Sequence, residues 1–219
     1  EAIRERYRRL YTGVFYRRFI LGQWAQAEGR VYDFFEPDMV GKVPQGKFDQ
    51  WYVSCDYGTV NPTSMGLWGR CGGTWYRVKE FYFSSRQQMR QMTDEEYAAA
   101  LQDLVGQRHL TAVIVDPSAA SFIEVLRRRG WNVRKAENDV LSGIRLTADC
   151  LKDGRIVICE GCADCLREMD EYVWDLSSGA KDRVRKEHDH AMDDMRYFVS
   201  TVLGSKTVGF AACSVERRK

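Results

Sequence analysis

The sequence has 219 residues, of which 44% are hydrophobic and 29% are charged, and its formal net charge is +2. This composition is that of a folded globular protein and excludes a disordered chain, and no apolar run is long enough to span a membrane. The length suits one main domain with an accessory segment. A charge this small does not by itself indicate a polyanionic partner, so the positions of the charged residues have to decide.

The cysteine content indicates a reducing compartment. Seven cysteines make an odd number, and no signal peptide precedes them. Free thiols in the cytoplasm are therefore expected. The first residue is not methionine, and a helical pattern begins at once, so we expect the sequence to be part of a longer chain.

Three regions are expected along the chain. Residues 1–47 form a helical linker or docking arm, because apolar residues recur at helical spacing from Ile3 to Ile20 and breakers follow between Pro37 and Gly46. Residues 48–204 form the main domain. Residues 205–219 form a thinly patterned C-terminal tail.

The main domain is expected to begin with three antiparallel strands at 51–56, 64–69 and 75–83. Gly72-Gly73 separates the second from the third and is typical of a tight hairpin turn. Helices and strands then alternate, which indicates parallel crossovers. Helices are expected at 93–105, 118–129, 139–152 and 163–174, and strands at 111–116, 131–135 and 155–159. The predicted fold class is α/β, with a mixed sheet of three antiparallel strands followed by parallel strands, flanked by helices.

A last helix is expected to begin after Asp189, a residue type that commonly caps helices. One stripe of this helix carries potential ligands: His190, Asp193, Asp194 and Tyr197. A second stripe is apolar and suits a helix that lies on a core: Ala191, Met195, Phe198 and Val202.

Three acidic positions stand out. Asp56 ends the first strand, Asp116 ends the strand at 111–116, and the last helix adds Asp193 or Asp194. Taken singly, each acid suits a turn or a solvated helix face. If the two strands are neighbours, however, the carboxylates repel one another unless a cation lies between them. Mg²⁺ prefers oxygen ligands, and two such ions about 4 Å apart can assist phosphodiester hydrolysis.

The runs Val53–Gly58, Val113–Ala119 and Asp189–Tyr197, in this order, resemble the nuclease domain of tailed-bacteriophage terminase large subunits. Arg17–Trp24, with Glu28-Gly29, is also similar to that family, and the resemblance covers residues 10–204. It implies an RNase H-like fold and cleavage of concatemeric double-stranded viral DNA during genome packaging, in the cytoplasm of the infected bacterial host.

The resemblance also implies cofactors and partners. It implies Mg²⁺ or Mn²⁺, as two ions, held by Asp56, Asp116 and Asp193. The implied partners are double-stranded DNA, the packaging ATPase domain of the same full-length chain, the small terminase subunit and the portal protein. No membrane is expected to take part. No Gly-x-x-x-x-Gly-Lys-Ser/Thr motif occurs, so nucleotide hydrolysis is not expected from this segment.

The last motif of the family, His-x-x-Asp, maps onto His190 and Asp193, and Asp194 stands where some members carry a second acid. Asp193 and Asp194 lie about 100° apart around a helix, so both cannot point straight at one ion. We therefore expect Asp193 to be the ligand and Asp194 to be a supporting or outer ligand. His190 is expected to support catalysis, by orienting water or contacting phosphate, unless it only caps the helix.

A basic cluster precedes this helix and is expected to contact DNA phosphates: Lys181, Arg183, Arg185 and Lys186. The alternative is a solvated loop. Arg127–Arg129 is left out of the site, because its position at a helix C-terminus already suits the helix dipole.

The spacing Cys159-x-x-Cys162-x-x-Cys165, with Cys150 upstream, invites a zinc or iron-sulfur interpretation. It lacks two paired Cys-x-x-Cys hooks, and buried thiols are the preferred interpretation.

Two other functions remain open. Another RNase H-like nuclease, such as a junction resolvase, would need the same acids, and a non-catalytic DNA-docking module would carry degenerate ones.

Overall fold

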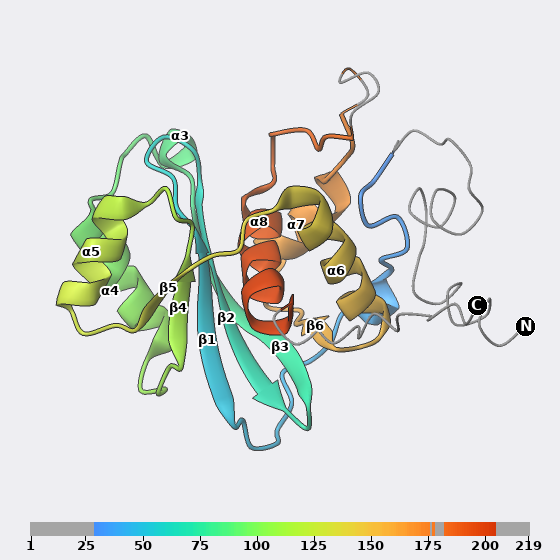
Figure 1. The fold of residues 1–219 in the computed structure, drawn as a ribbon, viewed down its shortest axis with the longest axis horizontal. Helices are drawn as coiled ribbons and strands as arrows, with labels where there is room; N and C mark the ends of the chain where they lie inside the picture. Colours follow the sequence, from blue (N-terminus) through green and yellow to red (C-terminus); the bar gives the residue numbers. More distant parts are fainter. Residues whose placement is uncertain (1–28, 176, 178–181, 205–219) are drawn as a thin grey trace, which may run out of the picture.

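The computed structural model of this chain describes residues 29–175, 177 and 182–204. The helix expected from Ile3 to Ile20, Lys181 of the basic cluster, and the expected tail 205–219 lie outside the described residues. The described part contains a central sheet with helices on both faces (Figure 1).

The sheet has six strands in the order β5-β4-β1-β2-β3-β6. Its strands are β1 (Gln50–Asp56), β2 (Thr63–Cys71), β3 (Thr74–Phe83), β4 (Ala112–Val115), β5 (Val133–Lys135) and β6 (Ile156–Ile158). β1, β2 and β3 are antiparallel. β4 joins β1, β5 joins β4 and β6 joins β3, all in parallel. The predicted mixed sheet of antiparallel and parallel strands is confirmed.

The helices match the predicted ones with two clear differences, the first of which is that the short helix at Ser85–Gln88 was not predicted. The helices are α3 (Ser85–Gln88), α4 (Asp94–Val105), α5 (Ala120–Arg128), α6 (Val140–Lys152), α7 (Ala163–Glu171) and α8 (His190–Phe198), with a 3-10 turn at Pro37–Met39 and a π-helical turn at Val199–Leu203. The expected helix 163–174 is too long, because Val173 and Trp174 leave it to form bridges with Arg30 and Val184.

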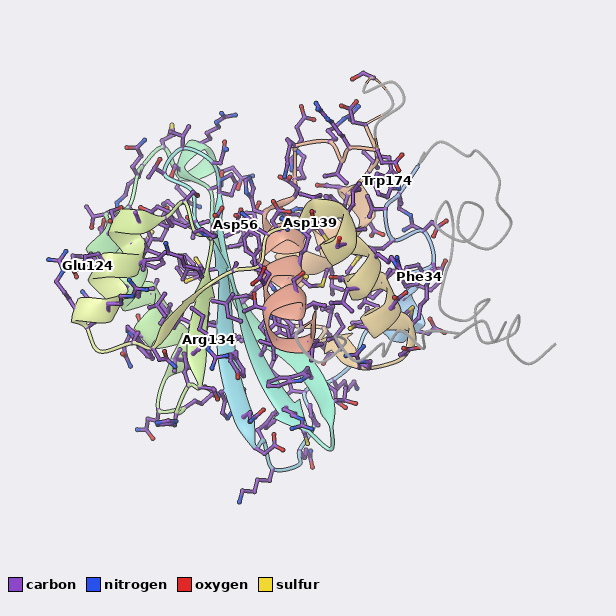
Figure 2. The ribbon with its side chains drawn as sticks, viewed as in Figure 1. Phe34, Asp56, Glu124, Arg134, Asp139 and Trp174 are labelled. Atoms are coloured by element: carbon purple, nitrogen blue, oxygen red, sulfur yellow. The ribbon has the colours of Figure 1, made fainter. Side chains whose placement is uncertain are left out.

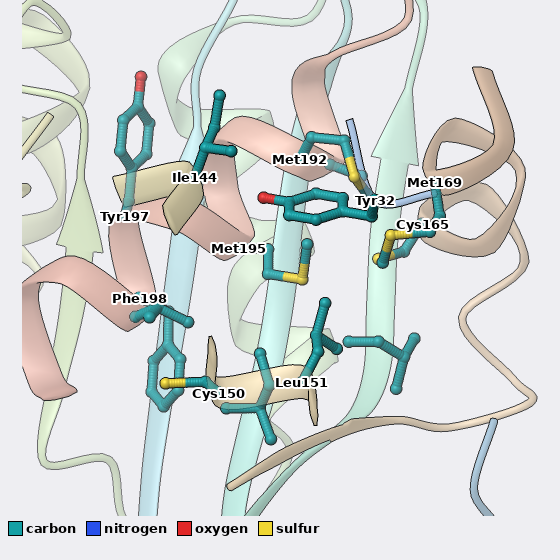
Figure 3. Packing of buried hydrophobic residues seen from close by; sticks show 14 of the residues in the cluster. Tyr32, Ile144, Cys150, Leu151, Cys165, Met169, Met192, Met195, Tyr197 and Phe198 are labelled. Atoms are coloured by element: carbon teal, nitrogen blue, oxygen red, sulfur yellow. The ribbon is translucent and has the colours of Figure 1, made fainter. Parts of the chain in front are cut away.

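Two apolar cores lie on opposite faces of the sheet. Figure 1 shows α4 and α5 on one face and α6, α7 and α8 on the other. The core on the side of α6, α7 and α8, which we call the second core, surrounds α8 (Figure 3). There the Phe198 ring stacks on Trp68, with 4.2 Å between the ring centroids. Val31, Tyr32 and Phe35 are buried in the same core, so the described end of the predicted arm packs against the main domain.

The cysteine cluster lies in this core. Cys150, Cys159, Cys162 and Cys165 are all buried, as predicted, and Cys162 donates its thiol hydrogen to the carbonyl of Arg77 at 3.2 Å. Burial raises the pKa of Cys159 to about 11 and that of Cys162 to about 12, so both thiols stay protonated at neutral pH.

In the part of the chain that the structure describes, no helix is long and apolar enough to cross a membrane.

A buried ion pair joins α8 to the sheet. Arg77 of β3 and Asp194 of α8 are fully buried, and the guanidinium meets the carboxylate through both terminal nitrogens, at 2.9 Å for Nη2. Ser54 Oγ donates to the same carboxylate at 2.8 Å, and Ser64 Oγ donates to its other oxygen. A Cβ at Gly66 would lie 2.2 Å from Arg77 Nη1, so only glycine leaves room for this pair.

Arg77→Met removes the cation and leaves the Asp194 carboxylate charged and buried. We expect this variant to lower the free energy of unfolding by about 3–5 kcal/mol, because an unpaired buried charge loses both solvation and its counter-ion. Urea unfolding measures the loss. The double variant Arg77→Met/Asp194→Asn carries neither charge of this pair and should recover part of the loss; only part, because Glu80, which lies 3.3 Å from Arg77 Nη2, keeps its charge. A double variant no more stable than Arg77→Met would contradict the role given to the pair.

Candidate active site

Two acids lie side by side at one edge of the sheet. β1 and β4 are parallel neighbours with Cys55 opposite Val115, so Asp56 and the following Asp116 are adjacent. The backbone N–H of Asp116 donates to the Cys55 carbonyl at 3.3 Å. Asp116 Oδ1 accepts the Ser118 N–H at 2.9 Å, which restrains its carboxylate. The condition under which the two acids meet is thus fulfilled, because their strands are neighbours through parallel pairing.

α8 brings further groups to the same edge. His190 Nδ1 lies 2.8 Å from Asp56 Oδ2. Tyr197, two turns along the helix, places its hydroxyl 3.4 Å from Asp56 Oδ1 and 3.3 Å from Asp116 Oδ2. The helical stripe predicted from the sequence therefore faces the two strand-end acids, through His190 and Tyr197.

Asp193 stands between two cations. Its Oδ1 accepts Arg196 Nη2–H at 2.9 Å, and its Oδ2 lies 3.2 Å from Lys186 Nζ. Arg196 is itself held by the carbonyl of Asn138 at 2.8 Å. A Cβ at Gly143 of α6 would lie 2.5 Å from Arg196 Cγ, so the close approach of α6 and α8 requires glycine there.

The start of α8 is fixed from another helix. Asp189 occupies the N-cap position, but the prediction that its side chain caps the helix is wrong: it makes no capping hydrogen bond and forms an ion pair with Lys186 at 3.1 Å. Glu168 of α7 takes over, accepting the Ala191 N–H at 2.6 Å and the Tyr82 hydroxyl hydrogen at 2.6 Å. A buried carboxylate thus satisfies the open end of the helix.

Asp194 lies apart from this edge. It points into the sheet, where Arg77, Ser54 and Ser64 hold it, and it is fully buried, whereas Asp193 on the preceding position faces the pocket. The two acids therefore diverge, as their separation around a helix requires. Asp194 supports the site by holding α8 on the sheet.

The predicted basic cluster is divided. Lys186 reaches the acids through its ion pairs with Asp189 and Asp193. Arg183 and Arg185 are exposed on a segment whose backbone bonds to residues 173–175. Lys181 lies outside the described residues.

These groups line a pocket of about 380 Å³. Its lining includes Asp56, Asp116, His190, Asp193 and Tyr197. A second pocket, of about 440 Å³, adjoins it through the shared residues Asn61, Lys186 and His190 and continues toward Arg86 and Arg167. Figure 2 shows Asp56 at one end of the sheet, beside the helices of the second core.

The pKa values of the pocket residues respond to burial and to the charges of neighbouring acids. Burial raises the pKa of Asp56 to about 6; the hydrogen bond from His190 opposes this shift, and the charge of Asp193 adds to it. Burial lowers the pKa of His190, but the bond to Asp56 outweighs it and leaves the pKa above its usual value. As they stand, the described residues include no group of three or more His, Cys, Asp or Glu side chains arranged to hold an ion.

Sequence reasoning gave too little weight to four residues of this region. Tyr197 was in the predicted stripe but received no role, and Arg196 stands at the i+3 position from Asp193, where an ion pair is a common helical contact. Arg77 and Glu168 gave no signal, because they lie 117 and 23 residues from the partners that they hold.

Comparisons with known proteins agree with this arrangement. The family model for the terminase RNase H-like domain matches residues 77–201. The terminase large subunit of Escherichia phage T5 is 22% identical over 216 residues, which are 92% of this chain and 48% of that protein. The structure of a large terminase from a thermophilic bacteriophage, in complex with ADP, is 46% identical, with a TM-score of 0.89 over 93% of this chain and 52% of that chain.

More distant structures share the fold. The nuclease domain of the P22 large terminase has a TM-score of 0.62 at 17% identity, over 78% of this chain and 90% of that chain. The large terminase nuclease of thermophilic phage G20c with bound magnesium has a TM-score of 0.60 at 14% identity, over 78% and 97%. The expected RNase H-like fold is confirmed. This chain spans about half the length of the T5 protein and of the ADP-bound large terminase.

Asp56→Asn should stabilise the protein in EDTA. The pKa of Asp56 rises from 3.8 to about 6 on folding, so the cost of burying its charge is absent below about pH 4 and complete above about pH 6. At 1.36 kcal/mol per unit, the gain at pH 7.5 is up to about 3 kcal/mol.

Urea unfolding at pH 4.5 and 7.5 measures this difference, which should shrink at the lower pH. Asp103→Asn, at an exposed position of α4, controls for the loss of one carboxylate and should change little. An Asp56→Asn variant less stable than the parent protein at pH 7.5 would show that repulsion and burial do not dominate at this position.

Proposed function

Since this chain belongs to the family of terminase RNase H-like domains, we propose that it is a divalent-metal-dependent endonuclease that cuts concatemeric double-stranded viral DNA during genome packaging. One observation carries the proposal. Asp56 and Asp116, at the ends of neighbouring parallel strands, share a pocket with Asp193 of a helix that packs on the same sheet.

The donor set fits a hard divalent cation. Asp56, Asp116 and Asp193 offer carboxylate oxygens, which Mg²⁺ and Mn²⁺ prefer. Burial, with a smaller contribution from the charge of Asp193, raises the pKa of Asp56, and a divalent ion would stabilise the charged carboxylate. We propose that these three acids hold two ions, which when bound would activate water and stabilise charge on the phosphate. The structure of the G20c nuclease with magnesium is in keeping with this choice of ion.

The neighbouring residues position the acids. His190 holds a proton against Asp56 Oδ2, and the Tyr197 hydroxyl can donate to Asp56 or Asp116. Groups that are not acids therefore hold both carboxylates in place. His190 is the group placed to hold or pass a proton at this edge. Lys186 and Arg196 neutralise the charge of Asp193. To bind an ion together with Asp56 and Asp116, the Asp193 carboxylate would turn away from these two cations.

The substrate contacts follow from the charges around the pocket. Lys186 lies at its rim, and the exposed Arg183 and Arg185 lie on the segment that leads to it, so these three cations are proposed to contact DNA phosphates, together with Lys181. Asp194 is excluded from the proposed ligands, because its oxygens are committed to Arg77, Ser54 and Ser64.

The proposed setting is the packaging machinery in the cytoplasm of the infected bacterium. Because the chain covers about half of the T5 protein and of the ADP-bound large terminase, we propose that an ATPase domain accompanies it in a longer chain. The small terminase subunit and the portal protein are the proposed further partners.

Asp56→Asn, Asp116→Asn and Asp193→Asn should each reduce Mn²⁺-dependent nicking of a supercoiled plasmid by at least about 100-fold, because each removes a proposed ligand and its charge. Gel electrophoresis of plasmid forms measures the rate, and circular dichroism checks the fold. Asp103→Asn is the matched control and should cut like the parent protein. Cleavage retained by a folded Asp56→Asn protein would refute the assignment.

A further inference from the structure

A third pocket, lined by arginines, lies at the other end of β1. It has a volume of about 420 Å³ and is lined by Arg70, Arg134 and Arg155, with Tyr52 and Trp75 beneath them. Gln50 at the start of β1 lines this pocket, and Asp56 lies six residues further along the same strand, which is roughly 20 Å in extended backbone. In Figure 2, Arg134 lies far down the strands from Asp56.

The sheet brings the three arginines together. Arg70 at the end of β2 pairs with Gln50 of β1 and with Trp75 of β3. Trp75 donates its backbone N–H to the carbonyl of Arg155 at 2.9 Å, which places Arg155 beside it. Arg134 comes from β5 on the far side of β4, opposite Ile114. Four strands and the segment before β6 thus converge on one pocket.

The charges of this pocket are not balanced. Its described lining contains three arginines and no aspartate or glutamate. Among the described residues, none of the three guanidinium groups makes a hydrogen bond, ion pair or ring contact, whereas Arg77 and Arg196 on the same face are both paired with carboxylates. Asp149, outside the lining, interacts electrostatically with Arg155, but among the described residues no carboxylate offsets Arg70 or Arg134. Like charges repel one another, so the pocket favours an anion.

The neighbouring helix end does not account for three cations. The π-helical turn Val199–Leu203 ends at the pocket through Thr201, Val202 and Leu203, and the carbonyls at a helix C-terminus carry about half a negative charge. Even with that partial charge and with Asp149 acting on Arg155, a net positive charge remains at Arg70 and Arg134. Their planar, fork-shaped donors suit phosphate oxygens.

We propose that this arginine pocket (Arg70, Arg134 and Arg155) binds the phosphodiester backbone of DNA at a distance from the catalytic edge. The choice of DNA rests on the proposed function. Phosphates of one strand are about 3.4 Å apart along a duplex, so roughly 20 Å corresponds to about six nucleotides from the scissile bond. The arginine pocket would hold the flanking DNA while the acids meet the phosphate that is cut.

Duplex binding in EDTA tests the arginine pocket without cleavage. Fluorescence anisotropy of a labelled 30-base-pair duplex is followed from low to high salt for Arg134→Gln and Arg155→Gln. Each variant should bind about three- to tenfold more weakly near 0.1 M salt, and the slope of log affinity against log salt should fall by about 0.9 for each phosphate that the variant no longer binds. Arg134→Lys should recover part of the affinity.

Arg127→Gln is the matched control, because Arg127 is an exposed arginine on α5, which packs on the opposite face of the sheet, and it should bind like the parent protein. Unchanged affinity and salt slope in both Arg134→Gln and Arg155→Gln would overturn the proposal. A competition experiment could also overturn the proposal. It would do so if inorganic phosphate or ADP bound in an Arg134-dependent manner while the affinity for the duplex did not depend on Arg134.

The two proposals fail separately. If the parent protein does not nick plasmid with Mn²⁺ but duplex binding depends on Arg134 and Arg155, the nuclease assignment is refuted and the arginine pocket stands. If the plasmid is nicked and binding is independent of both arginines, the reverse holds.

Discussion

The buried pair between Arg77 and Asp194 decides how the C-terminal helix meets the sheet. It joins β3 to α8 in a region without solvent, and Ser54 and Ser64 complete the hydrogen bonding of the carboxylate. Because successive residues differ by about 100° around a helix, turning Asp194 into the sheet turns Asp193 toward the pocket. Breaking the pair would leave an unpaired buried charge, so α8 has one favourable orientation.

That orientation also sets the partners of the acids in the pocket. Asp193 is paired with Lys186 and Arg196, and Asp56 with His190, so each of these acids is already held by a group of the protein. Asp116 shares the Tyr197 hydroxyl with Asp56. A divalent ion bound by Asp193 would have to compete with Lys186 and Arg196 for its carboxylate.

The sequence was sufficient where short-range patterns govern the chain. Gly72-Gly73 set the β2–β3 hairpin, the Thr93–Glu96 capping box set the start of α4, and the apolar run of β4 indicated a buried strand. Strand-end positions likewise identified Asp56 and Asp116.

Long-range contacts were beyond such patterns. A cap by Glu168 cannot be read from residues near Ala191. Asp189 is of a residue type that favours the N-cap position, yet its side chain pairs with Lys186 instead. Asp193 lines the pocket and Asp194 is buried against the sheet. Helix geometry predicts this difference only once Arg77 is known to lie beneath α8. The arginine pocket draws on residues from four strands, and no single stretch of sequence displays it.

The division of roles between Asp193 and Asp194 is the central claim, and crystals soaked in Mn²⁺ test it most directly. Anomalous diffraction recorded at the manganese edge locates the ion without regard to prior assumptions. We predict peaks bound by oxygens of Asp56, Asp116 and Asp193, with Asp194 still paired to Arg77. A manganese peak ligated by Asp194, with the Arg77 pair broken, would contradict the account.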